Sequence, residues 1–208
     1  MKEKNEDEMR RICLQLMLIA LILFSCKKDT MIPEDFSNPP LIPVADTVFT
    51  PYYILSGKHY CDKSRIEIFT GNELRFKVRF DCTVIYQSSD PQNQADINKL
   101  YGFSEGVDNH LNSARIGWNW MNNALHLYAY TYSNGSRAFK EIKDVSVGDT
   151  INCCISIERG AYLFRVDENK VILPRINTID KVNGFKQFPY FGGDEMAPHD
   201  ITIFIQDL

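Results

Sequence analysis

Hydrophobic and polar residues alternate along most of the chain after residue 48, a pattern typical of strands that bury one face. The clearest case is the stretch 114–132, where two alternating runs flank a short polar turn at 121–123. Asparagines in that turn tolerate the left-handed backbone that tight hairpin loops need. The apolar side of the two runs consists of Ile116, Trp118, Trp120, Leu125, Leu127 and Ala129. The stretch therefore predicts a β-hairpin with one face in a hydrophobic core.

Further strand candidates recur before and after the hairpin at the short spacing of an all-β protein. They cover residues 48–55, 65–69, 74–87, 99–103, 137–142, 149–158, 162–166, 171–174, 187–191 and 200–205. No amphipathic helical pattern of useful length and no internal repeat interrupts them. We therefore predict one all-β domain over residues 48–208, built as a two-sheet antiparallel β-sandwich.

The side of the hairpin opposite the apolar one carries the candidate glycan-binding residues. They are Arg115, Asn119, His126, Tyr128, Tyr130 and Tyr132. Sugar rings stack on aromatic faces through their C–H surfaces, while arginine, asparagine and histidine can hydrogen-bond to hydroxyl groups. The alternative is that the tyrosines pack in a second buried face.

A row of basic residues adds to this candidate site. Arg75, Lys77 and Arg79 occupy the polar side of the predicted strand 74–87. If this strand lies in the same sheet as the hairpin, the groove would be basic and would favour uronates or sulfated sugars. The alternative is an ordinary solvated ridge.

The C-terminal half resembles the back half of a concanavalin A-like lectin/glucanase sandwich. The resemblance is carried by VGDTINCCISIERGAYLFRVDENKVILP followed by FPYFGGDEMAPHDITIFI, in which paired strands and tight turns precede a glycine turn and a closing strand. Asn169 stands where glycine would be usual in that family. As a strand pattern the resemblance covers residues 48–208, and it implies a jelly-roll topology.

Enzymes of that family have strand motifs that this chain lacks. Retaining glucanases use an E-x-D-x-x-E strand, and no such run occurs here. Alginate-lyase-like members use an R-x-E-x-R strand and a Q-x-H strand, whereas this chain has Arg75-Lys77-Arg79 and no matching glutamine–histidine pair. Polysaccharide lyase chemistry through Tyr130 and His126 remains a further alternative. We expect a binding domain rather than an enzyme.

The net charge and the acidic residues near the C-terminus bear on whether the chain binds nucleic acid or a metal ion. The net charge of −4 argues against binding to nucleic acid. No cofactor is specified by a motif, but Asp194, Glu195 and Asp200 surround a glycine turn, and oxygen-rich loops of this kind can bind calcium. A solvated turn before the last strand explains the same residues.

Four cysteines lie in the predicted domain, at spacings that do not fit a zinc site. They are Cys61, Cys82, Cys153 and Cys154. Because Cys82 and Cys153 fall on apolar faces of predicted strands, we expect buried free thiols that pack as small hydrophobic groups. A disulfide from Cys61 to Cys82 or Cys154 is the alternative.

The N-terminus resembles a bacterial lipoprotein signal peptide over residues 1–25. Arg10 and Arg11 precede an apolar run, 12–24, which is too short to span a bilayer, and Ser25 then stands directly before Cys26. The acidic first eight residues suit no signal peptide, so Met9 is a candidate true start. The alternatives are a membrane anchor or a buried helix.

The resemblance implies that Cys26 is lipidated and becomes the first residue of the mature protein. Residues 26–47 contain four prolines and read as a tether, which could hold the domain roughly 60 Å from the lipid. Since no aspartate directly follows Cys26, the resemblance is to outer-membrane lipoproteins. We expect a lipid-anchored protein that faces the periplasm or the cell surface and binds glycan, or alternatively contacts another envelope protein.

Substitution of Cys26, the residue expected to carry the lipid, tests the predicted membrane location. Cys26→Ala should abolish lipid attachment and leave a stalled or released precursor, because each buried methylene of the acyl chains contributes about 0.8 kcal/mol to membrane binding. Mass spectrometry of the mature N-terminus is the measurement. An unmodified wild-type chain that begins before Cys26 would contradict both the lipid anchor and the tether.

Overall fold

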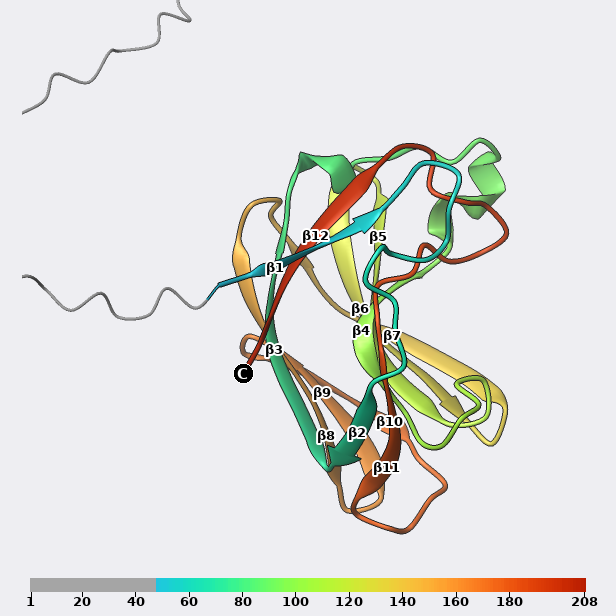
Figure 1. The fold of residues 1–208 in the computed structure, drawn as a ribbon, viewed down its shortest axis with the longest axis vertical. Helices are drawn as coiled ribbons and strands as arrows, with labels where there is room; N and C mark the ends of the chain where they lie inside the picture. Colours follow the sequence, from blue (N-terminus) through green and yellow to red (C-terminus); the bar gives the residue numbers. More distant parts are fainter. Residues whose placement is uncertain (1–47) are drawn as a thin grey trace, which may run out of the picture. The chain divides into compact units, whose positions relative to one another are not determined.

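The structure is a computed structural model and describes residues 48–208. In this part of the chain, two antiparallel sheets pack face to face (Figure 1). One sheet has the order β1-β12-β3-β8-β9-β10 and the other the order β2-β11-β4-β5-β6-β7. The strands are β1 (Thr50–Ile54), β2 (Ile68–Gly71), β3 (Glu73–Phe80), β4 (Asn98–Ser104), β5 (Ser113–Met121), β6 (Ala124–Ser133), β7 (Ser136–Val145), β8 (Thr150–Glu158), β9 (Ala161–Val166), β10 (Asn169–Pro174), β11 (Val182–Gln187) and β12 (Ile201–Asp207). The predicted jelly-roll β-sandwich is confirmed.

Short 3₁₀ turns are the only helical elements of the described residues. They are η1 (Cys82–Val84) and η2 (Pro91–Ala95). Within residues 48–208, no helix has the length and apolar character needed to cross a membrane. The predicted signal peptide (1–25), Cys26 and the tether (26–47) lie outside the described residues.

The predicted hairpin is present as β5 and β6, paired in register from Ser113↔Tyr132 to Met121↔Ala124. Asn122 and Asn123 form its turn with φ angles of 54° and 60°, the left-handed conformation that the sequence predicts. All six residues of its apolar side face the core, five of them fully buried and Trp120 partly so.

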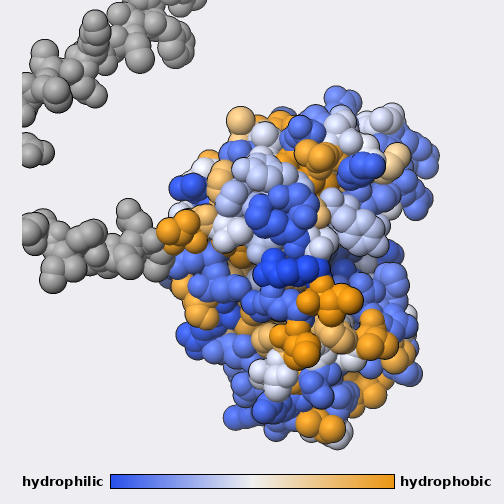
Figure 2. All heavy atoms as spheres, viewed as in Figure 1, coloured by the Kyte–Doolittle hydropathy of each residue, from blue (hydrophilic) through white to orange (hydrophobic). Residues whose placement is uncertain are grey.

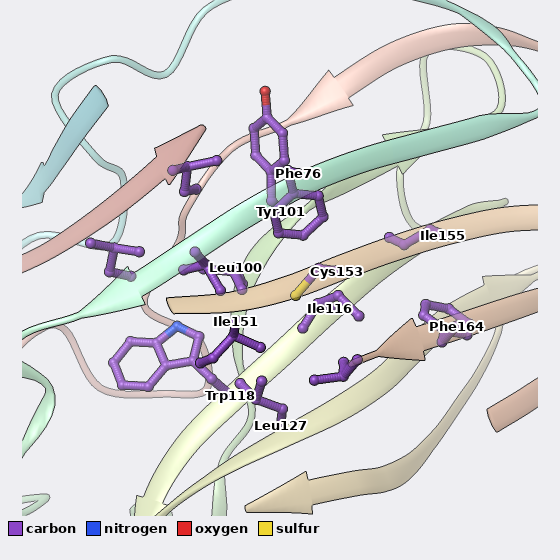
Figure 3. Packing of buried hydrophobic residues seen from close by; sticks show 14 of the residues in the cluster. Phe76, Leu100, Tyr101, Ile116, Trp118, Leu127, Ile151, Cys153, Ile155 and Phe164 are labelled. Carbon is purple, nitrogen blue, oxygen red and sulfur yellow. The ribbon is translucent and has the colours of Figure 1, made fainter. Parts of the chain in front are cut away.

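The core lies between this hairpin and strands β3 and β8 of the opposite sheet (Figure 3). Trp118 packs against Phe80 of β3, with ring centroids 5.7 Å apart, and the side chains of Ile151 and Cys153 from β8 point toward the same region. Burying a large apolar side chain contributes about 1.5–3 kcal/mol. The alternating pattern therefore places the side chains that stabilise the sandwich between its two sheets.

Two predicted strands have different bounds in the structure. The run 74–87 ends as β3 at Phe80, because the Asp81 side chain accepts a hydrogen bond from the Thr83 backbone N–H at 2.9 Å and caps η1. The last strand before the C-terminal one is β11, Val182–Gln187, rather than 187–191. Pro189 lies in the predicted run and has no N–H to donate to a sheet.

The four cysteines within residues 48–208 are free thiols. Cys153 is buried, as the pattern predicts, Cys61 is buried as well, and Cys154 is partly buried. Cys82 is exposed, and its expected burial is wrong because the chain leaves the sheet one residue before it. Burial raises the pKa of the Cys61 and Cys154 thiols.

A buried ion pair ties the end of β4 to the connection between β10 and β11. Arg175 donates to Glu105 through Nε at 2.6 Å and through Nη2 at 2.8 Å, and the two side chains are 1% and 5% exposed. Asn177 and Tyr162 also donate to the Glu105 carboxylate. These bonds outweigh the effect of burial and hold the pKa of Glu105 below its usual value. The pair fixes the loop that closes one end of the sandwich.

Removal of one partner should be costly. We expect Arg175→Ala to lower the free energy of unfolding by about 3–5 kcal/mol, because it leaves the Glu105 carboxylate buried without its cation. Urea unfolding monitored by tryptophan fluorescence measures the change. Arg165→Ala, which removes an exposed pair with Glu158, is the control and should have little effect. Equal losses in the two variants would contradict the structural role of the buried pair.

Candidate functional site

A cavity of about 410 Å³ lies on the face of the β4–β5–β6 region that points away from the core. Its aromatic lining is Tyr60, Tyr130, Tyr132, Phe188 and Tyr190. Its charged lining is Arg65, Lys99, Arg115, Arg137, Lys186 and Asp194. The wall therefore combines aromatic rings with an excess of positive charge.

The floor of the cavity follows a row of residues that are directly opposite one another across five strands. The row runs Gln187, Gly102, Arg115 and Tyr130, on β11, β4, β5 and β6, and it ends on β7 with Phe139, which lies outside this cavity. Gly102 has to lack a side chain, because a Cβ there would lie 2.7 Å from Cα and 2.8 Å from Cγ of Arg115. The glycine thereby leaves space for the arginine in the middle of the sheet.

Arg115 is the most unusual residue of the cavity, because its side chain carries a charge and is only 5% exposed. Within residues 48–208 its guanidinium makes no hydrogen bond and no ion pair, and its buried Nε has no partner. Its nearest compensation is the Tyr130 ring, whose centroid lies 5.6 Å from Cζ. A buried cation without a paired anion is expensive, and this one lies in the wall of an open cavity.

Two further cations of the cavity lie close to Arg115 and have no carboxylate partner among the described residues. Lys99 donates to the Ile97 carbonyl at 2.7 Å, and its Nζ is 4.8 Å from the Tyr130 ring centroid. Arg137 lies over the Phe139 ring, 5.7 Å from its centroid. We call Lys99, Arg115 and Arg137 the cation cluster.

The other two cations of the cavity are already neutralised. Lys186 Nζ lies 2.8 Å from both Glu67 and Asp207, and Arg65 donates to Glu67 at 2.9 Å. The net positive charge of the cavity is therefore concentrated in the cation cluster around Tyr130.

Burial and charge shift the pKa values of this cluster. Burial and, next to it, the charge of Arg115 lower the pKa of Lys99 to about 8. Burial and the hydrogen bond with Tyr132 raise the pKa of Tyr130 to about 12. At neutral pH the tyrosine is therefore a hydroxyl donor, and Lys99 carries its charge but loses it readily.

The candidate residues of the hairpin separate into two groups. Arg115, Tyr130 and Tyr132 line the cavity. Asn119 and Tyr128 are buried beside η2, where the Asn119 amide donates to the Ala95 carbonyl at 3.2 Å and the Tyr128 hydroxyl donates to Asn119. Packing, the alternative stated for the tyrosines, therefore describes Tyr128.

His126 lies apart from the cavity, at the turn end of β6. Its Nδ1 is 2.7 Å from Glu141, and its Nε2 is 3.1 Å from the Met121 carbonyl. Burial alone would lower the pKa of His126, but these bonds raise it. The histidine that lines the cavity is His110, whose ring meets that of Tyr132 edge-on at 5.1 Å.

Arg75, Lys77 and Arg79 lie on β3, in the sheet that does not contain the hairpin. Arg75 is paired with Glu73, and Arg79 lies over the rings of Phe49 and Phe204. Because β3 is not in the same sheet as the hairpin, Arg75, Lys77 and Arg79 do not contribute to the groove. The groove is basic because Lys99 and Arg137 join Arg115, and no pattern in the sequence singles out these two residues.

The proposed calcium ligands are not gathered around one point. Glu195 accepts hydrogen bonds from the backbone of Ser89 and Asp90, and Asp200 accepts one from the backbone of Ser56. Asp194 lies at the cavity instead. Among residues 48–208, no three histidine, cysteine or acidic side chains are placed to hold a metal ion.

No protein-family model matches the chain, and no curated protein sequence matches it. Similar solved structures include the alginate lyase AlyC3, which is 13% identical with a TM-score of 0.49, over 77% of this chain and 74% of that one. An alginate lyase from Alteromonas sp. 272 is 9% identical with a TM-score of 0.46, over 79% and 87% of the two chains. The carbohydrate-binding module CBM66 from Bacillus subtilis is 8% identical with a TM-score of 0.33, over 70% and 84%. At values this low, what the cavity binds has to be inferred from its own side chains.

The titration of Lys99 tests the electrostatics of the cavity. After reductive ¹³C-methylation, we expect the Lys99 signal in NMR spectra to titrate with a midpoint near 8, protonated below it and neutral above it. Arg115→Met should raise this midpoint, because it removes a neighbouring positive charge, and Arg79→Met in the other sheet should leave it unchanged. A midpoint insensitive to Arg115→Met would contradict the proximity of the two charges.

Proposed function

We propose that the domain binds an acidic glycan in the cavity, with an anionic group of the sugar against the cation cluster. The observation that carries this proposal is Arg115, a buried cation without a hydrogen bond or an ion pair in the described chain. A bound anion would supply the missing partner. Because a guanidinium can donate two parallel hydrogen bonds to one carboxylate or sulfate, uronates and sulfated sugars suit it best.

The aromatic lining supports a sugar rather than a small inorganic anion. Tyr190 is stacked on His59, with ring centroids 5.2 Å apart and planes 10° apart, so its ring is held in place at the cavity. Tyr132 provides a further ring in the cavity wall, and Tyr130, which is 3% exposed, lies beneath the cations. Fixed aromatic faces next to polar groups are what the C–H surfaces and hydroxyl groups of a sugar require. The volume of about 410 Å³ falls in the range of small-ligand sites.

The proposal includes the location inferred from the N-terminal sequence, which is attachment to the outer membrane. A lipid on Cys26 and a proline-rich tether would present the binding domain at the outer membrane, where polysaccharides occur. The competing proposal is a domain that contacts another envelope protein. On the face drawn in Figure 2, hydrophobic residues gather mainly in the lower half and the rest is largely hydrophilic. The competing proposal expects an exposed apolar patch without an aromatic-lined cavity, whereas such a cavity is present.

Polysaccharide lyase activity is a second candidate, favoured by the position of Lys99. An amine with a pKa of about 8 can accept a proton near neutral pH, and Arg115 beside it could neutralise the carboxylate of a uronate. Removal of the proton next to that carboxylate, with departure of the glycosidic oxygen, would give an unsaturated sugar. Ultraviolet absorbance of the products from alginate and polygalacturonate distinguishes a lyase from a binding domain.

Replacement of the buried arginine tests the binding site. We expect Arg115→Met to weaken binding by about tenfold to a hundredfold, because a hydrogen-bonded charged group contributes about 1.5–3 kcal/mol. Affinity gels containing alginate, polygalacturonate or a sulfated polysaccharide, followed by calorimetry, measure the change on the protein that lacks residues 1–25.

Binding of the acidic polymer to the wild-type protein should also weaken as the pH rises above about 8, where Lys99 loses its charge.

Arg165→Met is the matched control, because Arg165 is a paired arginine on the other sheet. Its affinity for the polymer should equal that of the wild type. Retention of all three polymers by Arg115→Met as well as by the control would refute the assignment of the anion site. A wild-type protein that binds no acidic polymer would refute the proposed function itself.

A further inference from the structure

We infer that Phe139 forms a second sugar subsite next to the cavity, so that the ligand is an internal segment of an acidic chain rather than a single sugar or a chain end. This inference rests on the proposed function, because it extends the same site. It depends on the continuation of the cavity, the exposure of Phe139 and the row of residues across the sheet.

The main cavity continues past the cation cluster into a second hollow of about 100 Å³. The two share Lys99, Tyr130, Arg137 and Gly193 in their walls, and Phe139 lines only the second. A ligand held at Arg115 therefore has a path over Tyr130 to Phe139 without leaving the surface.

The ring of Phe139 is 52% exposed although it is on a strand. It lies nearly parallel to Tyr130, with planes 14° apart and centroids separated by 6.5 Å, and the Arg137 guanidinium lies over it. These two neighbours hold the orientation of the ring. The residues two places before and after it on β7, Arg137 and Glu141, are charged, so Phe139 is an isolated apolar group on its side of the strand.

The second hollow also offers a polar side chain to a sugar. Asp96 lies there, and its carboxylate could accept hydrogen bonds from hydroxyl groups. Gly193 gives Asp96 the necessary space, because its φ is +84° and a Cβ on it would lie 1.9 Å from the Asp96 carboxylate. Phe139 and Asp96 together form the pair of surfaces that a pyranose ring needs, one apolar and one hydrogen-bonding.

The row across the sheet gives the direction of the chain. Gln187 stands at one end, where its side chain bonds to Asn109, the cation cluster is in the middle, and Phe139 is at the other end. Both ends carry groups that suit uncharged parts of a sugar. The anion site therefore lies between two flanking positions, and a chain would cross the strands with an acidic unit at its centre.

Chain-length dependence of binding is the experiment. Calorimetry with galacturonate and mannuronate, each from monomer to tetramer, should show affinity that increases with length for the wild type. For Phe139→Ala we expect the affinity for the longer oligomers to fall by about two- to tenfold, while the affinity for the monomer stays unchanged. Phe139→Trp should preserve the increase, because it retains an aromatic face.

The matched control is Tyr53→Ala, which removes an exposed aromatic residue from β1, an edge strand of the other sheet. It should behave like the wild type at every length. Monomer binding that depends on Arg115 but does not increase with length, or an increase that survives Phe139→Ala, would overturn the second subsite and leave the proposed function intact. Absence of binding at every length would overturn both.

Discussion

The contact between the apolar side of the β5–β6 hairpin and strands β3 and β8 is the interaction on which the rest of the structure depends. It buries Trp118, Ile116 and Leu127 completely, and so fixes which side of the hairpin faces the core. Because side chains alternate along a strand, the same contact turns Arg115 and Tyr130 to the outer face. The position of the core thus decides the position of the cavity.

The outer face of the hairpin is itself largely covered, which gives the site its electrostatic character. Segment 95–97 lies over β5, and Asn119 and Tyr128 are buried beneath it. The segment around Tyr190 pairs with Lys99 of β4. Arg115 is then removed from water without an anion beside it. An exposed arginine would be solvated and would attract many ligands weakly, whereas a desolvated one discriminates by charge.

Charge in the cavity is also distributed unevenly. Glu67 and Asp207 neutralise Arg65 and Lys186 at one side, and the cation cluster at the other side has no acid paired with it. The difference between paired and unpaired cations matters, because only unpaired cations give a net attraction for an anionic ligand. It explains how a chain with a net charge of −4 can have a strongly basic cavity.

The sequence by itself determined the features that depend on local periodicity and turn chemistry: an all-β domain, the hairpin with its asparagine turn, the apolar face around Trp118, and Arg115 with Tyr130 on the opposite face. Only the tertiary structure decided which strands are neighbours. β3 pairs with β12 and β8, so Arg75, Lys77 and Arg79 belong to the other sheet. β4 and β7 flank the hairpin, so Lys99 and Arg137 join Arg115 around Tyr130. The physical reason is that the period of a strand specifies which side chains share a face, but pairing between strands far apart in the chain is set by the packing of the whole core.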